Sequence, residues 1–213
     1  PHFQLLMIFL FPDFLNFVGV SDSLVILDAG NRERVMTIIN NKSNLITGIC
    51  LQRGHGNPQG GGIYCIHSDP LIQDVTIRNN YAYGPAGGWG GGLYFENSSP
   101  SIVDALVEDN TSTRGGGLYY RTFGNDYWTS KLLLLNVVIK NNNSEVEGGG
   151  IYFSGSNSEF QNVLIVGNTS TFGGGGMYCH ATNSTFKNLT ISENISSGGQ
   201  QQEGGGIYYG GRS

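Results

Sequence analysis

The sequence predicts an all-β solenoid, in which short strands from successive repeats stack on one another as coils. A glycine triplet followed by an aliphatic residue and a tyrosine occurs six times, at intervals of 30, 25, 33, 26 and 30 residues. In four of five repeats, an asparagine closes an apolar stretch 16 residues after that tyrosine. The triplets begin at Gly60, Gly90, Gly115, Gly148, Gly174 and Gly204. Each period is therefore one supersecondary unit, and we expect seven to eight coils.

The same spacing locates an insertion. From Tyr119 to Asn142 the distance is 23 residues instead of 16. The apolar columns of this repeat match the others only if the seven extra residues lie between Tyr120 and Lys131. Strands that face a core must stay in register, whereas a surface loop can lengthen at small cost. We therefore predict a side loop and not a broken coil.

Alternation along each strand predicts which residues face the core. The residues on either side of each repeated tyrosine are apolar, so they point inward and the tyrosine points outward. The tyrosine column is Tyr64, Tyr94, Tyr119, Tyr152, Tyr178 and Tyr208. The glycines suit turns that need a positive φ and close approach of the next coil. The repeated asparagines, such as Asn80, are predicted to form an architectural amide ladder rather than a ligand site.

Composition narrows the function classes. Glycine accounts for 34 of 213 residues and only 13% are charged, but 38% are hydrophobic and periodic, which argues against disorder. The net charge of −5 and the lack of a basic stripe argue against nucleic-acid binding. Cys50, Cys65 and Cys179 have no metal-site or disulfide spacing, so we expect small apolar core residues. The four histidines are scattered, which argues against a histidine metal site.

The two ends of the chain differ from the repeats. Residues 1–23 are predicted to be an irregular N-terminal rung or cap, with a signal-peptide remnant as the alternative. The apolar start lacks a basic segment and is interrupted at Pro12, and it is too short to span a membrane. Residues 24–213 are predicted to form the repeats. Both ends look cut, so we expect a monomeric module of a longer protein.

The repeats resemble the right-handed parallel β-helix, or pectin-lyase-like, family. The residues that carry the resemblance are GGGIY with the I-x-x-N stretch, and the phrases LDAGNRERVMTI and GGGIYCIHSDPLIQDVTIRNN. They are most similar to the repeats of polymorphic outer membrane proteins and to secreted bacterial β-helix proteins with a type IX secretion sorting domain. The resemblance implies a protein outside the bacterial cell or on its outer surface. It does not imply one activity, because this scaffold carries lyases, hydrolases, adhesins and passive stalks.

A catalytic role has weak support in the sequence. A polysaccharide lyase needs clustered carboxylates for Ca²⁺ and a basic residue to remove a proton, and a glycoside hydrolase needs two carboxylates at a defined separation. No signature of either kind is present. We therefore expect a non-catalytic module that needs no cofactor and presents a rigid face for adhesion or glycan binding. The alternative is a carbohydrate-active enzyme, most plausibly a Ca²⁺-dependent polysaccharide lyase.

Aromatic residues are the candidate ligand contacts. Trp89, Tyr127 and Trp128 fall in the longer connections, where exposed aromatic rings serve glycan or partner binding. Tyr64, Tyr94 and Tyr119 are candidates within the tyrosine column. That column either stacks against sugar rings or stacks on itself and stiffens the sheet.

A second polar column lies ten residues after each tyrosine and begins with two carboxylates, Asp74 and Asp104. On adjacent coils these carboxylates would repel one another at about 5 Å. The pair is either solvated or proton-sharing, or it binds a cation, for which Ca²⁺ fits the oxygen ligands. Alternation puts this column outside, and a bend would turn it inward.

Overall fold

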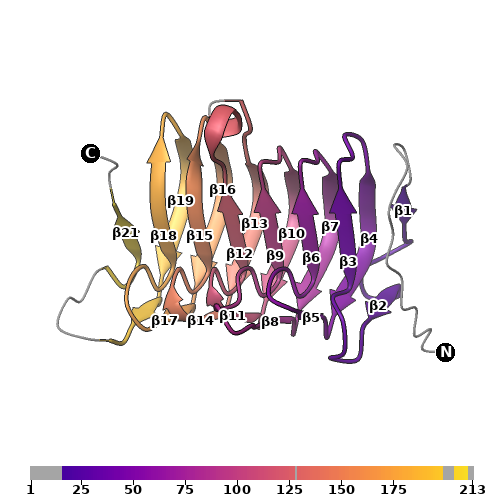
Figure 1. The fold of residues 1–213 in the computed structure, drawn as a ribbon, viewed down its shortest axis with the longest axis horizontal. Coiled ribbons are helices and arrows are strands. Elements are labelled where there is room, and N and C mark those ends of the chain that lie inside the picture. The colour runs from indigo at the N-terminus through magenta and orange to yellow at the C-terminus, as the bar shows by residue number, and fades with distance from the viewer. Residues whose placement is uncertain (1–15, 128, 199–203, 211–213) are drawn as a thin grey trace.

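The computed structural model describes residues 16–127, 129–198 and 204–210, and it shows a parallel β-solenoid of about seven turns (Figure 1). Each complete coil contains a short strand, a turn, an eight-residue strand, a sharp corner and a third strand, and the three strands belong to three different sheets. The glycine triplet then leads into the next coil. The predicted all-β solenoid and the predicted number of coils are confirmed.

The three sheets run the length of the molecule. Sheet A contains β1 (Phe17–Val18), β2 (Ile26–Asp28), β4 (Leu45–Gln52), β7 (Leu71–Arg78), β10 (Ser101–Glu108), β13 (Leu133–Lys140), β16 (Glu159–Val166) and β19 (Thr185–Ser192). Sheet B contains β3 (Met36–Ile39), β6 (Ile63–Ile66), β9 (Leu93–Glu96), β12 (Leu118–Arg121), β15 (Ile151–Ser156), β18 (Met177–Thr182) and β21 (Ile207–Tyr209). Sheet C contains β5 (His55–Gly56), β8 (Tyr81–Ala82), β11 (Thr111–Arg114), β14 (Asn143–Glu147), β17 (Thr169–Ser170) and β20 (Ile195–Ser196).

The core is built from the columns that alternation predicts. In sheet B, the residues before and after each tyrosine are buried from β6 to β18, as with Ile63 and Cys65. In sheet A, the columns that contain Val75 and Ile77 are buried from β4 to β16. At the last coil the same positions are open, and Ile207 is 44% exposed. No further coil stacks on β21 among the described residues, so these core positions are left partly uncovered.

The glycine triplets have the two backbone roles expected of them. The first glycine of every triplet has a positive φ, for example 67° at Gly90. The second and third glycines pack against the next coil: a Cβ on Gly91 would lie 2.4 Å from the carbonyl oxygen of Thr111 and 2.5 Å from that of Gly116. No side chain fits there, so the triplet is required by the stacking distance.

The asparagine ladder is also confirmed. The Oδ1 atom of Asn110 accepts hydrogen bonds from the backbone N and the Nδ2 of Asn80, both at 3.0 Å. Asn142 does the same for Asn110. Asn80, Asn110, Asn142 and Asn168 are buried. Gly54 precedes the ladder in the first coil, and its N–H donates to Asn80 at 2.8 Å. The ladder satisfies backbone groups that the sharp corner would otherwise bury without partners.

The middle of each sheet A strand contains a bend. One residue in each strand from β4 to β19 has a positive φ: Gly48, Asp74, Asp104, Asn136, Asn162 and Asn188. The bend places two consecutive residues, such as Gln73 and Asp74, outside, while Ile72 and Val75 point into the core. Asparagine and aspartate tolerate this backbone region better than other non-glycine residues. The second polar column therefore lies outside.

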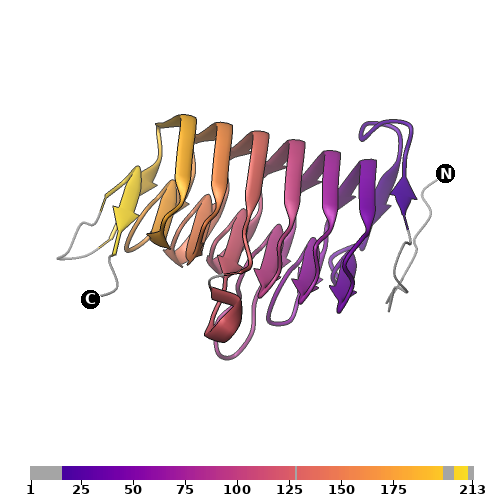
Figure 2. The same ribbon diagram turned by 90° about the horizontal axis from the view of Figure 1, so that it is seen from above.

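The predicted insertion is confirmed. The connection between β12 and β13 contains a single 3₁₀ turn, η1 (Gly124–Tyr127). Viewed from above in Figure 2, this turn projects from the outer side of sheet B. At the N-terminus, β1 joins sheet A through β4. Residues 1–15, which include most of the predicted rung or cap, lie outside the described part. Within the described part, no helix is long and apolar enough to cross a membrane.

Candidate functional site

The outer face of sheet B carries a continuous stack of tyrosine rings. Successive ring centroids from Tyr64 to Tyr208 lie 4.6 to 5.4 Å apart, with interplanar angles between 8° and 20°. Each tyrosine is in register with the next, as Tyr94 is with Tyr119. The coil spacing and the parallel register place the rings face to face. Of the two alternatives for the tyrosine column, the structure shows the one in which the rings stack on one another.

Stacking limits what a ligand could contact in this column. Tyr94 and Tyr119 are 1% and 5% exposed, and both faces of each ring lie against other aromatic rings. Arg34 covers Tyr64 at one end, with its guanidinium carbon 4.4 Å from the ring centroid. Burial raises the pKa of the Tyr119 hydroxyl to about 12. Tyr94 and Tyr119 thus offer a ligand no ring face, which sugar stacking needs, and almost no exposed edge.

A charged network beside the tyrosines was not foreseen from the sequence. Arg121 donates from Nε (2.8 Å) and Nη2 (2.6 Å) to Oε2 of Glu96, and the Tyr94 hydroxyl donates to the same oxygen. Arg121 and Glu96 occupy paired positions on adjacent coils. Charge-assisted bonds of this kind are strong and directional, so they fix the guanidinium plane. Both residues follow a repeated tyrosine by two positions, so comparing that position from coil to coil could have revealed the pair.

Trp89 does not lie on a protruding loop. It forms isolated bridges with Gln59 and Arg114 on the neighbouring coils, and its ring stacks on Tyr119 at 5.9 Å. The guanidinium carbon of Arg121 lies 5.2 Å from the Trp89 ring centroid. The indole Nε1 is covered and has no hydrogen-bond partner among the described residues. Trp89 is therefore held in place at the edge of the sheet B face by its stacking contacts, and its indole N–H is a covered donor without an acceptor among the described residues.

The insertion supplies the exposed part of this site. Phe123 is 47% exposed, its ring centroid lies 5.4 Å from the Arg121 guanidinium carbon, and its N–H donates to Asn97. Asp126 in η1 lies 4.0 Å from Nδ1 of His67, which belongs to the turn after β6. The Asp126 side chain therefore reaches the turn after β6, two coils toward the N-terminus. Tyr127 lies in η1 but its side chain, like the whole of Trp128, is outside the described part.

The structure thus brings four of the candidate residues onto one face. Tyr64, Tyr94, Tyr119 and Trp89 line the outer side of sheet B, and the insertion that carries Tyr127 overhangs it. We call this surface, together with Arg121, Glu96 and Phe123, the sheet B site.

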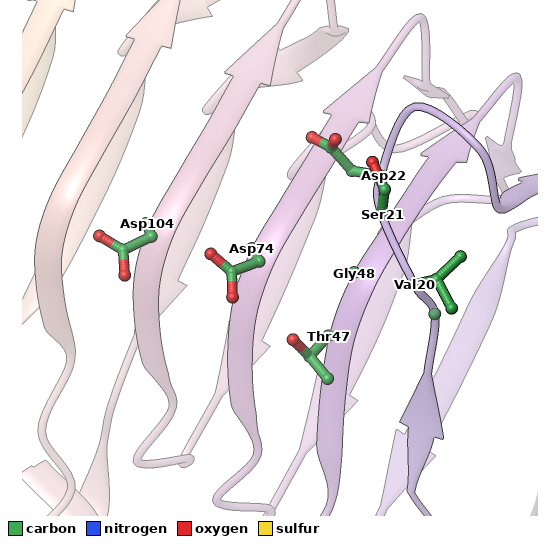
Figure 3. A pocket seen from close by; sticks show the side chains of 8 residues that line it. Val20, Ser21, Asp22, Thr47, Gly48, Asp74 and Asp104 are labelled. Carbon is green, nitrogen blue, oxygen red and sulfur yellow. The ribbon is translucent and has the colours of Figure 1, made fainter.

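Asp74 and Asp104 lie on a different face, on the outer side of sheet A. They line an open hollow of about 350 Å³ together with Asp22 and the backbone of Gly48. In Figure 3 the side chains of Asp74 and Asp104 extend in the same direction from neighbouring strands, and Asp22 lies on the loop that crosses the strand of Thr47 and Gly48, to one side of them. Asp104 accepts a hydrogen bond from Asn136 at 2.8 Å, and Asp22 accepts one from Thr76 at 2.6 Å.

These carboxylates lie next to one another without converging on one point. Among the described residues, no group of three or more His, Cys, Asp or Glu side chains could hold a metal ion. The residues that line the hollow also include no lysine or arginine. The arrangement offers oxygen ligands to a cation from one side only, and no neighbouring base to accept a proton from a substrate.

The cysteines lie where the sequence placed them. Cys50, Cys65 and Cys179 are buried and unpaired. Burial raises the pKa of the Cys65 and Cys179 thiols to about 12 in each case. Such thiols are protonated at neutral pH and unreactive, as expected of core residues.

No family model matches the chain, and no curated protein and no solved structure shows significant similarity to it. What the chain binds is therefore inferred from the geometry of its described residues.

Proposed function

We propose that this chain is a non-catalytic module of a secreted or cell-surface bacterial protein, a right-handed parallel β-helix that holds a glycan against the sheet B site. The observation that carries the proposal is the exposed Phe123 at the root of the insertion, packed on Arg121 beside Trp89. An otherwise uniform solenoid has no structural need for an apolar ring on a protruding connection. Exposed aromatic rings on a rigid frame are typical of binding surfaces.

The stacked tyrosines have a different role in this proposal. Their ring faces are occupied and Tyr94 and Tyr119 are almost fully covered, so the stacked tyrosines hold the site flat and do not themselves contact the glycan. The Glu96–Arg121 pair fixes the rings on either side of it. A preorganised surface loses little conformational freedom on binding, which favours affinity.

Binding to a glycan array tests the proposal. Three changes address the site: Phe123→Ala, the double change Trp89→Ala with Trp128→Ala, and deletion of residues 123–129. Leu71→Ala is the control, because Leu71 is an exposed apolar residue on the outer face of sheet A, away from the site. The expected result is binding by the wild type and the control, and loss of that binding in all three site variants. Unaltered binding by the Trp89/Trp128 double variant and by the deletion would show that the sheet B site is wrong.

The second candidate function is a Ca²⁺-dependent polysaccharide lyase: the hollow lined by Asp22, Asp74 and Asp104 would supply carboxylates for the cation, and the base would have to come from outside its lining. We propose Ca²⁺ as its cation, held by Asp74 and Asp104. A thermal melt with Ca²⁺ and with chelator tests the cation: a rise in Tm that disappears in Asp74→Asn/Asp104→Asn supports it. Unsaturated products from an acidic polysaccharide would favour the lyase over the binding module. A melt that does not respond to Ca²⁺ would exclude the cation.

A further inference from the structure

The outer face of sheet C carries an aromatic cluster that belongs neither to the sheet B site nor to the hollow on sheet A. The His55 and Tyr81 ring centroids lie 5.5 Å apart across two adjacent coils. The Tyr81 and Tyr83 centroids lie 6.0 Å apart, and the two rings are nearly parallel at 11°. Tyr83 is 50% exposed. β5 and β8, which contain His55 and Tyr81, lie in the row of short strands at the lower edge of the molecule in Figure 1.

Polar side chains continue this surface along the next coils. Tyr81 is in register with Thr111, and Thr111 with Asn143. Thr169 donates to Oδ1 of Asn143 at 2.7 Å, and Thr113 donates to Oε2 of Glu145 at 3.3 Å. We call the surface made of the three rings, these threonines, Asn143 and Glu145 the sheet C strip. Within a few coils it combines ring faces, hydroxyls, an amide and a carboxylate.

The charge of the strip restricts its ligand. Glu145 is exposed, and no salt bridge with it is found among the described residues. The basic residue within β11, Arg114, is bonded to Glu147 instead. Burial, followed by the charges of Glu145 and Tyr83, raises the pKa of Tyr81. An unpaired carboxylate without a neighbouring cation repels acidic polymers and accepts hydrogen bonds from neutral hydroxyl groups.

We propose that the sheet C strip is a second binding site, for a neutral polysaccharide that lies along the solenoid axis. A sugar ring packs on the half-exposed ring of Tyr83, which Tyr81 and His55 support, and the hydroxyls of the following sugars bond to Thr113, Asn143 and Glu145. Apolar sugar faces pack on aromatic rings while their hydroxyls need polar partners at the rim, and the strip provides both. The polar partners repeat at the coil spacing of about 4.8 Å, so an extended chain meets equivalent groups coil after coil.

Affinity electrophoresis tests this site with three neutral polymers, laminarin, mannan and dextran, and with alginate as the acidic polymer. The wild type is expected to bind at least one neutral polymer and not alginate. Tyr83→Ala should weaken that binding about ten-fold or more, because it removes the exposed ring. Tyr83→Phe keeps the ring and should retain most of the binding, and Leu71→Ala should bind like the wild type. Glu145→Gln should weaken binding to the neutral polymer and reduce the exclusion of alginate.

The same experiment separates this site from the sheet B site. Loss of neutral-polymer binding on deletion of residues 123–129, with normal binding by Tyr83→Ala, would support the sheet B site and overturn the sheet C strip. The opposite pattern would support the strip and count against the sheet B site. If the wild type binds none of the three neutral polymers, the sheet C strip is wrong.

Discussion

At the scale of single residues, the fold depends on amides that hold backbone groups at sharp corners. Asn142 accepts two hydrogen bonds from Asn110 and donates to Asn168 and to the carbonyl oxygens of Val107 and Lys140. It is fully buried, so water cannot replace these partners. The exposed column on sheet A contains the same residue type, but each of its amides bonds only to neighbouring side chains at the surface.

This difference predicts unequal costs for two substitutions on one coil. Asn142→Ala should lower the free energy of unfolding by about 2 to 4 kcal/mol, because buried donors and acceptors are left without partners. Asn136→Gly keeps the positive φ and should cost less than about 1 kcal/mol, since it removes only exposed bonds. Denaturant unfolding of both variants measures the difference. Equal costs would contradict the buried ladder.

How far the sequence predicts individual residues depends on whether a residue repeats. Asn80 and its equivalents recur at a fixed distance from the tyrosines, so their role could be predicted. The serines of the turn after sheet B were missed, although Ser68 and Ser158 accept bonds from the backbone of neighbouring coils at 2.9 Å. They bond across coils, and their repeats are interrupted by the insertion. Similarly, the partial burial of Trp89 could not be predicted, because it depends on contacts with Arg121 and Tyr119 from the next coil.

At the scale of the coil, the glycine triplet determines how closely one coil can stack on the next. Gly91→Ala should lower the free energy of unfolding by about 3 kcal/mol or more, because the new Cβ would overlap two backbone carbonyl oxygens. Gly124→Ala is the control for backbone strain without overlap: φ is 64° there, whereas Gly91 has no positive φ, and no atom lies within 4 Å of the added carbon. Its cost should be about 1 to 2 kcal/mol. Denaturant unfolding tests the pair, and a larger cost for Gly124→Ala would contradict the packing explanation.

The tyrosine stack predicts a loss of stability at alkaline pH. Burial raises the pKa of Tyr119 to about 12 and that of Tyr94 even further, whereas tyrosines of the unfolded chain titrate near 10.0. Above pH 10 the unfolded state releases these protons and the folded state keeps them, so the free energy of unfolding falls as pH rises. Each such tyrosine contributes about 1.4 kcal/mol per pH unit. Below pH 10 the contribution is fully present.

Two measurements check this behaviour. Unfolding midpoints at pH 9 and pH 11 should show the decrease, and the tyrosinate absorbance should reveal residues that ionise only on unfolding. Tyr119→Phe, which cannot ionise, should make the decrease shallower. If all tyrosines of the folded protein titrated near 10.0, the buried stack would be wrong.

At the scale of the whole molecule, repetition made the architecture predictable and the binding faces much less so. The strand registers, the insertion between β12 and β13 and the inward columns follow from spacing alone. The direction in which the insertion leans could not be predicted, because it depends on the contact of Asp126 with a turn two coils away. The bend in each sheet A strand could not be predicted either, because the alternation of side chains does not report backbone conformation. The right-handed winding stays a prediction.

The central claim is that each repeat adds one coil of constant rise in a single register. Gln73, Gln161 and Lys187 occupy one outward column of sheet A, three and four coils apart. Nitroxide labels on Gln73→Cys with Gln161→Cys, and on Gln73→Cys with Lys187→Cys, report these two separations by electron paramagnetic resonance. The three native thiols are buried and should not react. We predict that the second pair is farther apart than the first by one coil step, about 4.8 Å. Equal distances, or a shorter distance for the second pair, would contradict the solenoid.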